Sequence, residues 1–352
     1  MAAGAAPARG GYRVTPPPPG DLVDWPADFG TRFTVTVDTE EEFDWSQPLD
    51  SGNRNVTAMA AMPEGHRRFA DRGVPLTLLV DHPIATDPRS IDILRAVVAD
   101  GRSAVGTQLH PWVNPPIEEA MSPQNSFAGN LPAALQAAKL DVLGAAITKA
   151  IGIPPRVYRA GRYGIGPDTL GLLAARGYRI DSSMRARYDY AAEAGPDFSA
   201  IGNHAFRCGP NNQIVELPLS TVFIGAARGG GAALYRALGR LPKGRGLFSR
   251  TGLLSRIALT PEDMPLAAAR EAVAVAVGEG VRVLNFSFHS PSLVPGCTPY
   301  VRDAGDLAAF HHWWDRVLGD LQRRGVAPAC LDELIAGSAR GSAAAASPAH
   351  AV

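Results

Sequence analysis

The chain has 352 residues, of which 46% are hydrophobic and 19% are charged, so it can bury the core of one large or two smaller α/β domains. Its formal net charge is zero, which removes the global attraction that nucleic-acid-binding proteins and anionic-membrane binders use. The three cysteines are widely spaced and form no CxxC pair, which argues against a disulfide framework and against a thiolate zinc site.

The N-terminal region is rich in alanine, glycine and proline and contains no apolar segment of the secretory type. No apolar run of about 18 residues occurs, so we expect no transmembrane segment and take a cytoplasmic protein as the default. The prolines at 16–19 exclude a helix or a central strand there, and we predict a flexible segment over residues 1–30. One domain is predicted over residues 31–338, followed by a disordered alanine- and serine-rich tail over residues 339–352.

The first predicted strand begins at Arg32 with β-branched and aromatic residues and breaks abruptly into carboxylates. Since side chains alternate along a strand, Asp38 and Glu40 share one face, which suggests a base and a metal ligand. The alternative is that the glutamates at 40–42 form an acidic helix N-terminus stabilised by the helix dipole.

Strand, polar loop and helix then alternate at least four times, the pattern typical of parallel strands joined by helical crossovers. We therefore predict an α/β fold, an irregular (β/α) barrel with seven or so parallel strands. The expected strands lie at residues 32–37, 75–83, 103–106, 157–164, 178–183, 214–219, 282–289 and 328–335, and the expected helices at residues 58–71, 87–101, 131–151, 167–176, 260 onward and 306–324.

Residues able to do chemistry follow most of these strands. Carboxylate and imidazole suit zinc or another divalent ion, and a second histidine is available as an acid, so the set resembles a hydrolytic metal site. Each residue is a weak signal alone. The set comprises Asp38, Glu40, His110, Arg159, Arg162, Asp181 and His289.

In chain order these residues lie in the motifs VDTEEEFDW, GTQLHPW, RAGRYG and FSFHSPS. The motifs resemble those of the polysaccharide deacetylase (NodB-homology) family over about residues 31–335, and FSFHSPSLVPG is most similar to the WalW-like branch. The resemblance implies the NodB-like barrel and a hydrolase that acts on non-peptide carbon–nitrogen bonds.

By this resemblance, Asp38 is the catalytic base and Glu40 a metal-binding carboxylate. His110 matches one histidine ligand, whereas Gln108 stands where the family has the other. A glutamine amide can coordinate a metal but is neutral and a poorer zinc ligand than imidazole. The implied cofactor is a divalent metal, zinc in the first instance.

The resemblance also assigns roles to the later motifs. Arg159 or Arg162 would orient Asp38 and keep it ionised. Asp181 resembles the acid that pairs with the catalytic histidine, and His289 maps onto the general acid. The implied reaction is metal-assisted removal of N-acetyl groups from an N-acetylated polysaccharide or glycan precursor.

Three aromatic residues near the motifs, Trp112, Tyr163 and Phe288, are candidates for a sugar-stacking wall or are plain core aromatics. A basic insertion at about residues 225–258 contains seven cations and no acid from 228 to 256. It is interpreted as a solvated insertion over the mouth of the site, or as a surface that binds an anionic glycan or membrane.

Two further functions stay open because of Gln108. The first is that of a degenerate, metal-free protein that binds glycan. The second is that of a metal-free amidohydrolase that acts on a small cyclic amide. In each case the expected partner is a small molecule or glycan, with no nucleic acid. The sugar, the linkage and the oligomeric state are not set by the sequence.

Overall fold

The computed structural model describes residues 11–345, and a sheet of nine strands forms its centre. The strand order is β10-β1-β2-β3-β4-β5-β7-β6, with β11 paired to β1, and a separate pair is formed by β8 and β9. The bounds are β1 (Arg32–Thr39), β2 (Leu76–Val80), β3 (Ala104–Leu109), β4 (Val157–Ala160), β5 (Ile180–Asp181), β6 (Phe206–Cys208), β7 (Ile214–Glu216), β8 (Thr221–Ile224), β9 (Ser255–Ala258), β10 (Val283–His289) and β11 (Ala327–Pro328).

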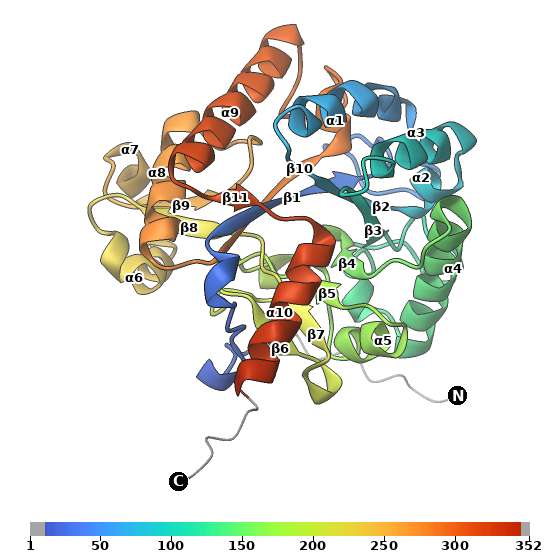
Figure 1. The fold of residues 1–352 in the computed structure, drawn as a ribbon, viewed down its shortest axis with the longest axis horizontal. Helices are drawn as coiled ribbons and strands as arrows, with labels where there is room; N and C mark the ends of the chain where they lie inside the picture. The colour runs from blue at the N-terminus through green and yellow to red at the C-terminus, as the bar shows by residue number, and fades with distance from the viewer. Residues whose placement is uncertain (1–10, 346–352) are drawn as a thin grey trace.

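Helices surround the outside of this curved sheet (Figure 1). Most connect successive parallel strands, as crossover connections require. None of the described helices is long and apolar enough to cross a membrane. The bounds are α1 (Met62–Ala70), α2 (His82–Thr86), α3 (Pro88–Val98), α4 (Ala133–Ile151), α5 (Thr169–Ala175), α6 (Gly231–Leu238), α7 (Gly244–Arg250), α8 (Leu266–Gly278), α9 (Ala304–Arg323) and α10 (Leu331–Ala345).

The predicted irregular barrel is confirmed. The strands from β10 to β7 run parallel, and in the described residues only β6 is antiparallel within this sheet. β1 lies between β10 and β2 and is buried over its last seven residues, as expected for a parallel strand covered on both faces. The register pairs Asp38 with His289, so the first and last candidate residues meet at the carboxyl ends of two neighbouring strands.

The segment after β7 joins the far part of the sheet back to β10. The amide of Leu217 donates to the carbonyl of Asp181 at 2.8 Å, and the amide of Ser220 donates to the carbonyl of Asn285 at 3.2 Å. These are isolated hydrogen bonds rather than a ladder. The sheet therefore curves into a barrel whose last step is closed by loop backbone.

Alternation along β10 separates the chemistry from the core. Phe286 and Phe288 point outward, where Phe288 packs against Phe69, Phe310 and Trp314. Asn285 points inward and donates to Ser182 Oγ at 2.8 Å. The inner face is thus polar and the outer face is aromatic, because side chains in a strand alternate between faces.

The N-terminal region differs from its prediction. Residues 1–10 lie outside the described part, but residues 11–30 pack against the domain rather than preceding it as a flexible lead. Trp25 and Phe29 are buried and stack at 4.5 Å between ring centroids, and Arg13 pairs in a backbone bridge with Asp197. Buried aromatic area holds this segment in place.

Three predicted boundaries are wrong. Residues 260–263 form a turn in which Thr260 Oγ1 accepts from the Glu262 amide at 3.2 Å, and the helix α8 begins only at Leu266. The last predicted strand, residues 328–335, reduces to the two-residue β11 and is followed by α10. Because α10 runs to Ala345, the first part of the predicted tail is helical, and residues 346–352 lie outside the described part.

The basic insertion is an excursion between β8 and β9 that contains α6 and α7, seen at the left of Figure 1. It has a small apolar core of its own, formed by Phe223, Leu238 and Leu254. The insertion is therefore folded on the β8–β9 hairpin.

Candidate active site

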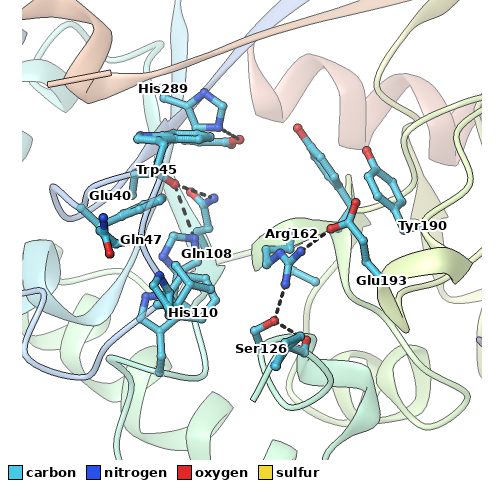
Figure 2. A pocket seen from close by; sticks show the side chains of 18 of the residues that line it. Glu40, Trp45, Gln47, Gln108, His110, Ser126, Arg162, Tyr190, Glu193 and His289 are labelled. Carbon is cyan, nitrogen blue, oxygen red and sulfur yellow. Dashed lines mark hydrogen bonds and ion pairs between the residues drawn. The ribbon is translucent and has the colours of Figure 1, made fainter. Parts of the chain in front are cut away.

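A cavity of about 610 Å³ opens at the carboxyl ends of the strands and is lined by Asp38, Glu40, Gln108, His110 and His289 among others. Its volume is in the range of small-ligand sites. Figure 2 shows Glu40, Gln108, His110 and His289 on one side of the space, with Arg162 and Glu193 facing them from the other side. Eight of the residues predicted from the sequence therefore share one cavity, since Trp112, Arg162 and Tyr163 also line it.

Asp38 is 2% exposed at the end of β1 and is ion-paired with Arg159, which is fully buried in β4. The guanidinium of Arg159 also donates to Thr36 Oγ1 at 2.7 Å and to the carbonyl of Ser182 at 2.9 Å. Because the arginine is held on three sides, it fixes the position of the carboxylate as well as balancing its charge.

Arg162, the other predicted partner of Asp38, does not contact it. Its guanidinium donates to Ser126 and to Glu193 and lies 4.2 Å from the centroid of the Phe127 ring. Arg162 lies in the short turn after β4 with a φ of 53°, a left-handed conformation that turns its side chain away from the strand direction. Of the two arginines, only Arg159 orients the carboxylate.

His289, the last residue of β10, is held by Glu262. Its Nδ1 lies 2.7 Å from Glu262 Oε2, and its backbone amide donates to Glu262 Oε1 at 2.9 Å. Burial opposes the charged imidazole, but the carboxylates of Glu262, Glu40 and Asp38 together outweigh it and raise the pKa of His289 to about 10. The free Nε2 lies 3.7 Å from Asp38 Oδ2. His289 is thus a cation whose unbonded nitrogen faces the proposed base.

The expectation that Asp181 pairs with His289 is wrong, since Glu262 occupies that place. Asp181 is fully buried in β5, where its Oδ1 accepts from the Ser183 amide at 3.1 Å. Burial raises its pKa to about 6, and its charge helps to raise the pKa of the neighbouring buried carboxyl of Glu216. Ser183 in turn accepts from the Ala160 amide at 2.9 Å, so Asp181 supports the junction of β4 and β5.

Glu40, Gln108 and His110 form a compact group beside Asp38. Gln108 Nε2 donates to Glu40 Oε2 at 3.3 Å, and His110 Nε2 lies 3.4 Å from the same oxygen. Burial raises the pKa of Glu40 to about 8, although His289 and His110 act in the opposite direction. Glu40 Oε1 and Gln108 Oε1 are buried and have no hydrogen-bond partner among the described residues. Such orphaned oxygens are costly unless a ligand satisfies them.

A second layer of acids lies behind His110. Its Nδ1 is 2.8 Å from Glu41 Oε2, and Trp112 Nε1 donates to Glu41 Oε1 at 2.6 Å. Asp81 accepts from the amides of Glu41 at 2.6 Å and Ile84 at 2.8 Å. Burial raises the pKa of Glu41 to about 7 and that of Asp81 well above its usual range. This layer fixes the orientation of the imidazole ring.

Two overlapping groups offer ligands to a metal ion. Glu41, Asp81 and His110 present ligand atoms within 4.8 Å of one another, but these atoms already bond to each other, to Trp112 and to backbone amides. The group of Glu40, Gln108 and His110 Nε2 lines the cavity and carries the two orphaned oxygens. Carboxylate, amide and imidazole together fit a divalent cation. The second group fits better because its atoms are free to accept one.

The predicted aromatic wall is corrected at one position. Trp112 and Tyr163 line the cavity, although Trp112 is 1% exposed and stacks on His110 at 4.3 Å between centroids. Phe288 is absent from the lining because alternation along β10 turns it away from His289 into the core. Trp45 and Tyr300 stand nearer the chemistry, with centroids 5.1 and 6.3 Å from the His289 ring.

Sequence reasoning missed Glu41, Asp81 and Glu262. The sequence does contain a signal for two of them. Asp81 directly follows β2, next to the end of β1, and Glu41 lies in the run of three glutamates. Glu262 was hidden because Thr-Pro-Glu-Asp is also a typical helix start. None of the described residues from 225–258 lines the cavity, so the basic insertion forms no part of its wall, and its place over the mouth of the site stays a prediction.

No protein-family model and no curated protein sequence matches this chain. Among solved structures, it is similar to a candidate polysaccharide deacetylase from Mycobacterium smegmatis, with 17% identity, a TM-score of 0.52, and coverage of 95% of this chain and 98% of that one. It is also similar to a candidate glycoside hydrolase/deacetylase from Parabacteroides distasonis, with 13% identity, a TM-score of 0.53, and coverage of 85% and 69%. At these identities the likeness concerns the fold, and the WalW-like branch stays a prediction.

Proposed function

We propose that this chain, which has the fold of the polysaccharide deacetylases, hydrolyses N-acetyl groups on an N-acetylated polysaccharide or glycan precursor. The observation that carries the proposal is the facing pair of Asp38 and His289, whose Oδ2 and Nε2 lie 3.7 Å apart at the cavity. Each has a buried partner of opposite charge, Arg159 for the acid and Glu262 for the histidine. A carboxylate that can accept a proton, facing a histidine that can donate one, is what amide hydrolysis needs.

In the proposed reaction, Asp38 accepts a proton from the attacking water. Its ion pair with Arg159 balances the charge of the carboxylate and holds it in position while it does so. His289 donates the proton on Nε2 to the departing amine of the sugar, since Nδ1 is occupied by Glu262. One proton thus passes from the water to the carboxylate of Asp38, and another passes from the imidazolium of His289 to the amine.

We propose that Glu40, Gln108 and His110 hold a divalent metal, with zinc as the first candidate. When bound, the ion would act as a Lewis acid on the acetyl carbonyl. Glu41 would fix the His110 ring with Nε2 directed at the ion, as carboxylates commonly do for metal-binding histidines. Because burial raises the pKa of Glu40 to about 8, binding the ion would require this carboxyl to release a proton.

A second candidate function is favoured by one contact. Gln108 donates its amide N–H to Glu40, a bond that a metal-free protein could keep. In that case the chain would bind glycan without turnover, or would act as a metal-free amidohydrolase on a small cyclic amide. Metal analysis of the purified protein separates these functions from the first, since only the deacetylase requires a stoichiometric, chelator-sensitive ion.

The test is acetate release from a panel of N-acetylated and O-acetylated oligosaccharides, with and without added divalent metal. We expect Asp38→Asn and His289→Ala each to lower kcat by about 10²–10⁴-fold, the usual contribution of a positioned acid or base. His311→Ala is the matched control, because this histidine lies on α9 outside the cavity lining. Unchanged turnover in either site variant would refute the role assigned to it.

A further inference from the structure

The cavity wall contains a cation that the proposed reaction does not use. Arg185 lines the cavity together with Tyr163 and Tyr190. Its guanidinium carbon lies 4.0 Å from the centroid of the Tyr188 ring and 5.5 Å from that of Tyr163. Across residues 11–345 it forms no ion pair with a carboxylate. Aromatic rings hold the group in place but do not neutralise its charge.

Three neighbouring arginines each have an acid. Arg159 is paired with Asp38, and Arg162 with Glu193. Arg187, two residues along, lies 3.9 Å from Glu279. A partly buried arginine without such a partner carries an uncompensated desolvation cost. Arg185 therefore stands out among the cations of the barrel mouth.

Two further residues lie near Arg185. Arg256, which is outside the cavity lining, also stacks on Tyr188, with its guanidinium carbon 3.5 Å from the ring centroid, and it forms no ion pair in the described part of the chain. The Tyr190 hydroxyl is buried beside Arg185 and donates to no acceptor among the described residues, although this tyrosine lines the cavity. One cation and one free donor thus face the same space.

We infer that Arg185 and Tyr190 form a subsite that binds an anionic group, a carboxylate or a phosphate, carried by the glycan. The planar guanidinium offers paired donors that match both groups, and a phenol O–H adds a third. A neutral sugar would leave the charge of Arg185 uncompensated. This inference rests on the proposed function only in taking a glycan as the occupant of the cavity.

The subsite and the proposed base lie in one cavity, so a single ligand can reach both. Tyr163 and Tyr300 line the same cavity, and each lies within electrostatic range both of Arg185 and of an acid at the reaction centre, Asp38 for Tyr163 and Glu40 for Tyr300. The anionic group therefore belongs to the sugar that is deacetylated or to a unit next to it. The substrate class is an acidic or phosphorylated N-acetylated glycan.

The experiment measures binding by calorimetry to the full chain carrying Asp38→Asn, so that turnover does not interfere. Three probes are compared: a hyaluronan tetrasaccharide, which carries carboxylates, N-acetylglucosamine 1-phosphate, and neutral chitotetraose. We expect Arg185→Gln to weaken binding of at least one anionic probe by about 10–100-fold, and that of chitotetraose by less than about threefold. Which anionic probe responds distinguishes carboxylate from phosphate.

Arg187→Gln is the matched control, since it removes a neighbouring arginine outside the cavity lining and should leave all three affinities unchanged. Arg185→Lys keeps the charge but loses the planar fork, and should give an intermediate affinity. The affinity of the unsubstituted subsite for the anionic probe should also fall as salt is added. This salt series keeps the inference testable even if Arg185→Gln does not fold.

An equal loss for neutral and anionic probes would overturn the inference, because Arg185 would then bind sugar hydroxyls or act in packing. Unchanged binding of every probe would overturn it as well. Failure here is separate from failure of the proposed function. A chain that releases acetate from neutral sugars without anion preference keeps the function and loses the subsite, whereas anion binding without acetate release does the reverse.

Discussion

His110 and His289 reach the cavity from the ends of β3 and β10, and each is built into a chain of two carboxylates. In both, Nδ1 is bonded to a glutamate, at 2.8 Å for His110 with Glu41 and at 2.7 Å for His289 with Glu262. In both, Nε2 lies near a second acid, 3.4 Å from Glu40 and 3.7 Å from Asp38. The local arrangement is nearly the same.

The difference lies in the two supporting glutamates. Although burial opposes it, the adjacent His289 holds the pKa of Glu262 below its usual range, and Ser292 Oγ also donates to this carboxylate at 2.6 Å. Glu41 instead shares its site with the buried Asp81, and burial raises its pKa to about 7. A firmly ionised glutamate makes its histidine an acid, whereas a shared, partly protonated glutamate leaves its histidine suited to a metal.

The largest expected effect is that of Glu262→Gln, which removes the carboxylate bonded to His289 Nδ1. Glu262 is the largest of the charges that raise the pKa of His289 to about 10 against the effect of burial, so its loss should lower that pKa, although Glu40 and Asp38 still act to raise it. A general acid works below its pKa, so the alkaline limb of the kcat/KM profile should move to lower pH. On the alkaline side of the shifted limb we expect kcat/KM to fall about 100-fold or more.

The measurement is the pH profile of kcat/KM for acetate release. Asp181→Asn is the control, because Asp181 is an equally buried acid that does not contact His289. It should leave the alkaline limb in place even if the folded state is weakened. An alkaline limb that stays where it is in Glu262→Gln would show that another group supplies the proton.

Glu262 and Asp181 also show which parts of the site could be predicted from the sequence. The parallel strands and the placing of Asp38, His110 and His289 at strand ends could be predicted, because period, strand composition and chain order act locally. The choice of Glu262 over Asp181 could not, since it depends on how a loop of turn residues folds onto β10. The burial of Phe288 could have been predicted from alternation alone.

A smaller effect is expected from substituting Glu41, the glutamate bonded to His110. In Glu41→Gln the amide can still bond to His110 Nδ1 and Trp112, but the ring loses its carboxylate partner. Removing such a partner usually weakens metal binding by about 10–100-fold. We expect a loss in this range when zinc is titrated calorimetrically, with the alkaline limb of kcat/KM unchanged. A shifted limb with normal zinc affinity would reverse the roles given to the two histidines.

The smallest effect tests the one ligand position at which the chain departs from the family it resembles. Gln108 presents a neutral, buried and unpaired Oε1 beside Glu40, so Gln108→His replaces a weak zinc ligand with imidazole. We expect zinc to bind about 10-fold tighter in a calorimetric titration, with the alkaline limb fixed by Glu262 and His289 as before. Gln47→His is the matched control, because Gln47 lines the same cavity but lies on the loop after β1 and makes no contact with Glu40 or His110 among the described hydrogen bonds. If both variants gain equally, the tighter binding comes from any added histidine, and position 108 is not a ligand position.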